Sequence, residues 1–171
     1  MLFVDLGEVR RGPVAVGVQV EPPDQVFADI EYAISAPVVL RGRLSESGRD
    51  EYYFTGRLTT QVIVPCRRCL REVPTGIDAE LGALFTEEDS DDPAAYPLVK
   101  EDGALDLRAM VRETLLLHMP EYALCRDDCK GLCARCGADW NEGPCECRSE
   151  PDLRWAALQA LTARTDESEE S

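Results

Sequence analysis

The chain has 171 residues, which is enough for one medium domain or for a small domain with an appended module, and a hydrophobic content of 44% supports a real core. Acids outnumber bases 33 to 18, so the net charge at pH 7 is −15. This charge makes free nucleic acid an unfavourable partner for the molecule as a whole, and it fits a basic protein or a basic region of a ribonucleoprotein better. Solubility alone also explains an acid excess.

The sequence shows no pattern of a secretory signal or of a membrane span. The residues Met1-Leu2-Phe3-Val4-Asp5 contain no basic region followed by an apolar stretch, which a secretory signal would need. No apolar run approaches the length that spans a membrane. We therefore expect a cytoplasmic chain.

The first half of the chain has the apolar and polar alternation that is typical of strands. The expected strands are residues 2–6, 14–20, 26–34, 38–44, 51–65 and 70–85. A polar turn over 45–50 joins two of them into a hairpin, and the last is expected to bend near Pro74. Successive strands with short connections favour an antiparallel sheet or a partly open β-barrel.

A helix follows these strands. Thr86 to Pro97 is predicted to be an acidic loop, and Leu105 to Met119 has apolar residues at helical spacing, with Asp106 as the expected N-cap. Pro120 should end this helix, which we expect to cover one face of the sheet. His118, the only histidine, fits a helix C-terminal position better than a metal-ligand role.

The remaining chain is cysteine-rich and then helical. A capping-box pattern begins at Ser149 and predicts a short helix to Leu161, followed by an acidic tail. The fold class is therefore α+β: a sheet with a covering helix, then a cysteine-rich module and a C-terminal helix. The expected segments are 1–120, 121–164 and 165–171.

The eight cysteines are the most informative residues of the chain. Six of them lie between Cys125 and Cys147, and Cys66 and Cys69 form a separate C-x2-C pair. Eight thiolates make two sets of four, the number that tetrahedral zinc needs. Proximity in the chain predicts two zinc ions, one held by Cys133, Cys136, Cys145 and Cys147 and the other by Cys66, Cys69, Cys125 and Cys129. The alternative is one zinc held by the downstream cysteines, with Cys66 and Cys69 free.

Other uses of these thiols stay open at this point. Disulfide frameworks belong to secreted chains, a redox C-x2-C would need a βαβ setting, and an iron–sulfur cluster would use the same thiolates. A catalytic zinc would keep an open position and favour histidine or carboxylate ligands, so structural zinc is the better prediction.

Arginine is concentrated in the strand region. The segment from Tyr52 to Arg71 holds four arginines and no acid. Arginine binds phosphate through two parallel hydrogen bonds, so these side chains and two on the preceding strand could contact RNA. The candidate RNA contacts are Arg41, Arg43, Arg57, Arg67, Arg68 and Arg71. An equally good reading is that arginines near thiolates balance the negative charge of a metal site.

Several ordered motifs resemble the YceD family, proteins implicated in accumulation of large-subunit ribosomal RNA. The matching pieces span about residues 38–161: Cys66-Arg67-Arg68-Cys69-Leu70, the helix end from Arg112 to Pro120, Leu124-Cys125, the run from Cys129 to Gly137, Asn141, Cys145-Glu146-Cys147 and Arg154-Trp155. Trp140 stands where the family pattern has an aliphatic residue.

The resemblance implies a non-enzymatic role in ribosome biogenesis: 23S ribosomal RNA accumulation or processing, and large-subunit assembly. The implied partner is a large-subunit ribosomal RNA precursor or a basic ribosomal protein, with no membrane and no small-molecule substrate. The alternatives are an RNA-processing nuclease, a thiol redox protein or a zinc-ribbon module of a transcription complex.

Overall fold

The computed structural model describes residues 2–28, 30–87, 94–147 and 154. The chain divides into two compact units, residues 1–129 and 130–171, which are described separately. The predicted C-terminal helix, apart from Arg154, and the predicted acidic tail lie outside the described residues. The three predicted segment boundaries therefore remain predictions.

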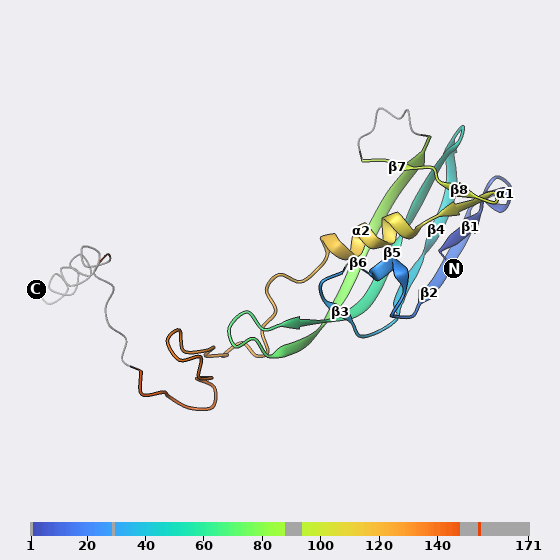
Figure 1. The fold of residues 1–171 in the computed structure, drawn as a ribbon. Coiled ribbons are helices and arrows are strands. Elements are labelled where there is room, and N and C mark those ends of the chain that lie inside the picture. The colour runs from blue at the N-terminus through green and yellow to red at the C-terminus, as the bar shows by residue number, and fades with distance from the viewer. Residues whose placement is uncertain (1, 29, 88–93, 148–153, 155–171) are drawn as a thin grey trace, which may run out of the picture. The chain divides into compact units, whose positions relative to one another are not determined.

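A six-stranded sheet forms the centre of the first unit (Figure 1). Its strands are β2 (Val14–Val20), β3 (Ala33–Ile34), β4 (Val38–Gly48), β5 (Glu51–Pro65), β6 (Glu72–Thr86) and β7 (Tyr96–Pro97). The order is β2-β4-β5-β6-β7, and β3 pairs with the end of β5 beyond β4. All pairs are antiparallel except β6 with β7. The predicted antiparallel sheet is thus confirmed, and it is open.

The long hairpin of β5 and β6 forms the central part of this sheet. Pairing runs without a change of register from Tyr52 opposite Phe85 to Pro65 opposite Glu72, straight through the Pro74 region. Alternate side chains of β5 point into the core, where Tyr52, Phe54 and Leu58 are fully buried. This is the period-2 burial expected of a sheet with one face in the core and one in solvent.

Helix α2 (Arg108–Leu117) covers the apolar face of the sheet (Figure 1). Met110, Val111 and Leu115 face inward and are almost completely buried, which confirms the predicted covering role. A small sheet lies beside the helix and consists of β1 (Phe3–Asp5), β9 (Ala104–Asp106) and β8 (Lys100–Glu101). A short helix, α1 (Leu6–Val9), follows β1 and was not expected from the sequence.

Two of the predicted elements differ from the structure. Most of the strand expected over 26–34 is absent: η1 (Gln25–Phe27) is a 3-10 turn capped by Asp24, and only Ala33 and Ile34 pair as β3. The helix expected from Leu105 begins at Arg108 instead, because Leu105 pairs with Val4 in the small sheet. Tertiary pairing decided the second case, since a local pattern cannot show which distant strand will be available.

Two glycines let the sheet pack closely around an aromatic side chain. Gly42 on β4 and Gly56 on β5 lie opposite each other, and the ring of Phe54 lies against both. A Cβ on Gly42 would overlap the carbonyl oxygen of Thr55 and lie 2.5 Å from Cζ of Phe54. The absence of side chains at these two positions therefore makes the space that Phe54 fills.

Among the described residues, no helix is both long and apolar enough to cross a bilayer.

Candidate metal centres

The first cysteine group lies at the turn between β5 and β6. Cys66 and Cys69 follow β5 directly, and Cys125 and Cys129 come from the segment after α2. The main chain joins these two segments, since the N–H of Arg67 donates to the carbonyl of Ala123 at 3.0 Å. Cys66, Cys69 and Cys129 are buried. Thiols some 60 residues apart are thus brought together by the sheet and its covering helix.

The sulfur atoms of this group have the spacing of a tetrahedral metal site. The Sγ atoms of Cys66 and Cys129 are 3.9 Å apart, and those of Cys69 and Cys125 are 3.6 Å apart. Four zinc–sulfur bonds of about 2.3 Å give a tetrahedron with edges of about 3.8 Å. A disulfide would need about 2.05 Å, and all eight cysteines are free thiols. The sulfur–sulfur distances therefore fit a metal ion of the size of zinc.

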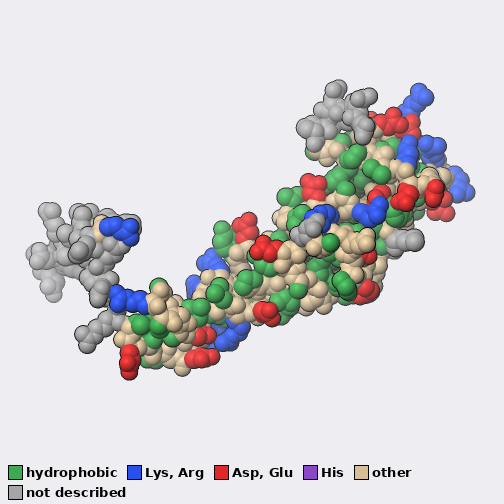
Figure 2. Space-filling model, viewed as in Figure 1, with side chains coloured by type: hydrophobic (Ala, Val, Ile, Leu, Met, Phe, Trp, Pro, Cys, Tyr) green, Lys and Arg blue, Asp and Glu red, His purple; other side chains and the backbone are tan. Residues whose placement is uncertain are grey.

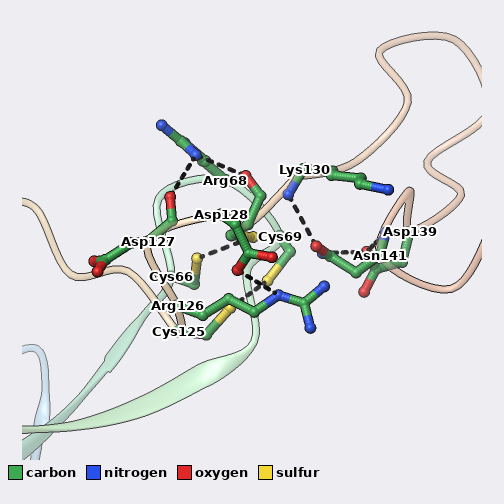
Figure 3. Close-up of polar contacts among 11 residues, drawn as sticks. Cys66, Arg68, Cys69, Cys125, Arg126, Asp127, Asp128, Lys130, Asp139 and Asn141 are labelled. Carbon is green, nitrogen blue, oxygen red and sulfur yellow. Dashed lines mark hydrogen bonds and ion pairs between the residues drawn. The ribbon is translucent and has the colours of Figure 1, made fainter.

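Arg68 fastens the two segments of this site together (Figure 3). Its Nη1 donates to the carbonyl of Cys129 at 2.7 Å and to that of Asp127 at 3.3 Å. These are charge-assisted bonds to main-chain acceptors of the segment after α2. Arg68 therefore has a structural role that its sequence position alone did not indicate.

The second cysteine group belongs to the second unit and is built within 15 residues. Cys133, Cys136, Cys145 and Cys147 place their sulfur atoms within 4.8 Å of one another. A small hairpin supports them: Leu132 bridges Asp139, and the N–H of Trp140 donates to the carbonyl of Gly131 at 2.9 Å. Cys136 and Cys147 are exposed, so this group is more open to solvent than the first.

The two C-x2-C turns have the same backbone geometry. In each, the residue after the second cysteine has a left-handed conformation and donates its N–H to the carbonyl of the first cysteine at 2.9 Å. At the second site this residue is Gly137, with φ +72°, for which the conformation carries no penalty. At the first site it is Leu70, with φ +60° and a side chain that is 65% exposed.

The thiols of each group influence one another's ionisation. Backbone N–H groups of Cys69 and Cys125 lower the pKa of Cys66 to about 6, and the indole N–H of Trp140 lowers that of Cys145 to about 6. Burial raises the pKa of Cys125 to about 12, and the hydrogen bond with Cys136 raises that of Cys147 to about 12. One thiolate, that of Cys66 in the first group and that of Cys145 in the second, therefore forms readily in each group.

The structure brings all eight predicted cysteines into two groups of four, with the membership that the sequence suggested. Either group could hold a metal ion. His118 is the C-cap residue of α2, and its Nδ1 lies 2.9 Å from the carbonyl of Thr114. No local pattern indicated that Trp140 Nε1 lies 3.4 Å from Cys145 Sγ, since only the fold of the hairpin places them together.

The six candidate RNA contacts separate into two sets. Arg41, Arg43 and Arg57 lie on the solvent face of β4 and β5, with Arg41 directly opposite Arg57. The other three lie at the turn after Pro65, which is roughly 26 Å from Arg57 at 3.3 Å per strand residue. Figure 2 shows no single basic patch on the face that carries α2; acidic and basic side chains are mixed there.

Members of the two sets differ in their partners. Arg57 forms ion pairs with Asp78 and Glu80, at 3.2 and 2.8 Å. Within the described part of the chain, the guanidinium groups of Arg41 and Arg43 have no ion pair. Arg67 stacks on the ring of Tyr122 at 5.3 Å, and Arg68 binds the main-chain carbonyls described above.

The described residues thus combine an open sheet, a covering helix and two groups of four cysteines. The model of the family described as large ribosomal RNA subunit accumulation protein YceD matches residues 54–162, which is more than half of the chain. The chain therefore belongs to the YceD family.

Relatives occur in bacteria and plants. An uncharacterized protein of Mycobacterium leprae is 28% identical over 90% of this chain and 74% of its own length. YlbN of Bacillus subtilis, also named uncharacterized, is 29% identical over 78% of each chain. A chloroplastic YCED homolog 1 of Arabidopsis thaliana, named a large ribosomal RNA subunit accumulation protein, is 25% identical over 67% of this chain and 45% of its own. No solved structure matches the chain.

Proposed function

We propose that both cysteine groups hold structural zinc. The observation that supports this is the pair of sulfur distances at the first site, 3.6 and 3.9 Å, which suit a closed tetrahedron of thiolates. Four thiolates leave no open coordination position for a substrate. The site therefore fastens the segment after α2 to the β5–β6 turn, and the second site holds its own hairpin together.

We further propose that the chain is a non-enzymatic factor in large-subunit assembly that supports accumulation of 23S ribosomal RNA in the cytoplasm. The family description supports this role. In this proposal the metal sites stabilise the fold, and other surfaces of the protein bind a precursor particle of the large subunit. Within the described residues, the two groups of potential metal ligands consist of cysteine alone, which is the composition of structural sites.

Depletion of the protein followed by ribosomal RNA profiling tests this role. We expect large-subunit RNA to fall relative to small-subunit RNA, with unprocessed precursor accumulating. The purified protein should also sediment with pre-large-subunit particles in a salt-sensitive manner. Cleavage of a ribosomal RNA precursor by the purified protein alone would instead show a nuclease.

We propose that the solvent face of β4 contributes RNA contacts through Arg41 and Arg43, because both guanidinium groups are available. Arg41→Glu with Arg43→Glu should weaken binding to the precursor particle and reduce the salt dependence by about two units of slope, roughly one for each lost phosphate contact. Sedimentation across a salt series measures both quantities.

A matched control uses Arg11→Glu with Arg49→Glu, which changes the net charge equally at exposed positions outside β4. If both double variants weaken binding to the same extent, the effect is one of overall charge, and the β4 face is not the contact. Arg67, Arg68 and Arg71 need separate variants, because they belong to the other set.

A further inference from the structure

A small exposed surface lies beside the first cysteine group, and the fold itself does not account for it. We call it the knuckle tip and define it by Arg67, Leu70 and Tyr122. The side chains of Leu70 and Tyr122 are 65% and 71% exposed. The guanidinium of Arg67 lies over the Tyr122 ring at 5.3 Å, and the main-chain bond from Arg67 to Ala123 holds the two segments side by side.

Leu70 is the unexpected member of this surface. A left-handed backbone conformation is unfavourable for a leucine because its Cβ crowds the following carbonyl. Glycine avoids this strain, and the corresponding residue of the other C-x2-C turn is Gly137. The Leu70 side chain gains little from burial in return. A strained residue with an exposed apolar side chain points to a role in contact with another molecule.

The charge at the tip favours a protein as that molecule. Residues 66–72 and 121–129 together carry four arginines and four acids, so the charges of these side chains cancel. A divalent ion held by four thiolates adds two negative charges, which leaves the two segments around the tip net negative when the ion is bound. RNA would be repelled, and a leucine offers no ring for a base to stack on. Tyrosine and arginine are both enriched among the hot-spot residues of protein–protein interfaces.

We propose that the knuckle tip is a docking point for a basic protein of the large-subunit precursor, which receives Leu70 in an apolar pocket and packs against Tyr122. This inference rests on the proposed role in large-subunit assembly. It makes the first metal site a requirement for binding, because that site joins the two segments that carry the tip.

The variant Leu70→Gly separates binding from folding, because the inference predicts opposite effects on the two. Relief of the strained conformation should raise the melting temperature by about 2–4 °C. Loss of the side chain should weaken co-sedimentation with purified pre-large-subunit particles at least tenfold. Tyr122→Ala should weaken it similarly without lowering the metal content. Val99→Ala is the control, since Val99 is also apolar and 51% exposed but lies outside the tip.

A photo-crosslinking amino acid at position 122 identifies what the tip touches. We expect a crosslinked product that contains a ribosomal protein and that ribonuclease treatment does not remove. This product should be absent when the crosslinker is placed in the Leu70→Gly variant. A crosslink to RNA, or no crosslink in a particle that binds the wild type, would overturn the inference, as would unchanged binding of Leu70→Gly or a lowered melting temperature. If the wild-type chain does not sediment with the particles at all, the assembly role fails and the docking inference fails with it.

Discussion

If the two cysteine groups hold zinc as proposed, a chelator should unfold residues 130–147 and release residues 121–129, while the sheet of the first unit stays folded. Structural zinc in small modules supplies on the order of 10 kcal/mol of folding free energy. The hairpin of the second unit has few buried apolar side chains to replace that contribution. The sheet has its own core, which includes Phe54, Leu58 and Leu115.

Hydrogen exchange before and after addition of a chelator measures this effect along the chain. Protection should be lost over residues 121–147 and retained in β4, β5 and β6. Single variants give the matched comparison: Cys145→Ser should expose only the second unit, whereas Cys66→Ser should loosen the β5–β6 turn and residues 121–129. Loss of protection throughout the sheet on chelation would mean that the first site supports the whole fold.

Gly42→Ala should be strongly destabilising, although it adds only one methyl group. The new Cβ would overlap the Thr55 carbonyl and lie 2.5 Å from the Phe54 ring and 2.9 Å from Cα of Gly56. Overpacking of a core typically costs about 1–3 kcal/mol, and we expect about 3 kcal/mol here because two of the three neighbours are main-chain atoms that cannot rotate away. Urea unfolding of the first unit measures the change.

The control is Gly76→Ala on β6, where a Cβ would meet no atom within 4 Å. This variant should keep or slightly raise stability, because alanine loses less backbone entropy than glycine on folding. The double variant Gly42→Ala with Phe54→Leu, which shortens the opposing side chain, should recover part of the loss. Equal stability of the two glycine variants would show that Gly42 and Phe54 are not packed as described.

Secondary structure could be predicted from the sequence where the apolar pattern is long. The prediction was wrong where pairing with a distant strand decided the structure. The alternation through Tyr52, Phe54 and Leu58 required a strand, and the spacing of Met110, Val111 and Leu115 required a helix. Leu105 fitted the same helical pattern, yet its pairing with Val4 makes it part of a strand. That pairing joins residues about 100 apart, which no local pattern can reveal.

The second cysteine group was accessible to sequence reasoning because its ligand spacing is local, and Cys133 and Cys136 need only two intervening residues to share an ion. The first group followed by elimination, since its two pairs lie some 60 residues apart in the chain and were left over once the last four cysteines formed one site. The surroundings were not accessible in this way. The bond of Arg68 to the carbonyl of Cys129 depends on how the segment after α2 meets the β5–β6 turn.

The metal content of the purified full-length chain tests the central claim most directly. If both cysteine groups are structural sites, elemental analysis of protein prepared without added metal should find two zinc ions per chain. Cys66→Ser and Cys145→Ser should each reduce that number to one, and the double variant should contain none. A wild-type chain with one zinc or none, or with iron and sulfide in place of zinc, would contradict the two-zinc scaffold.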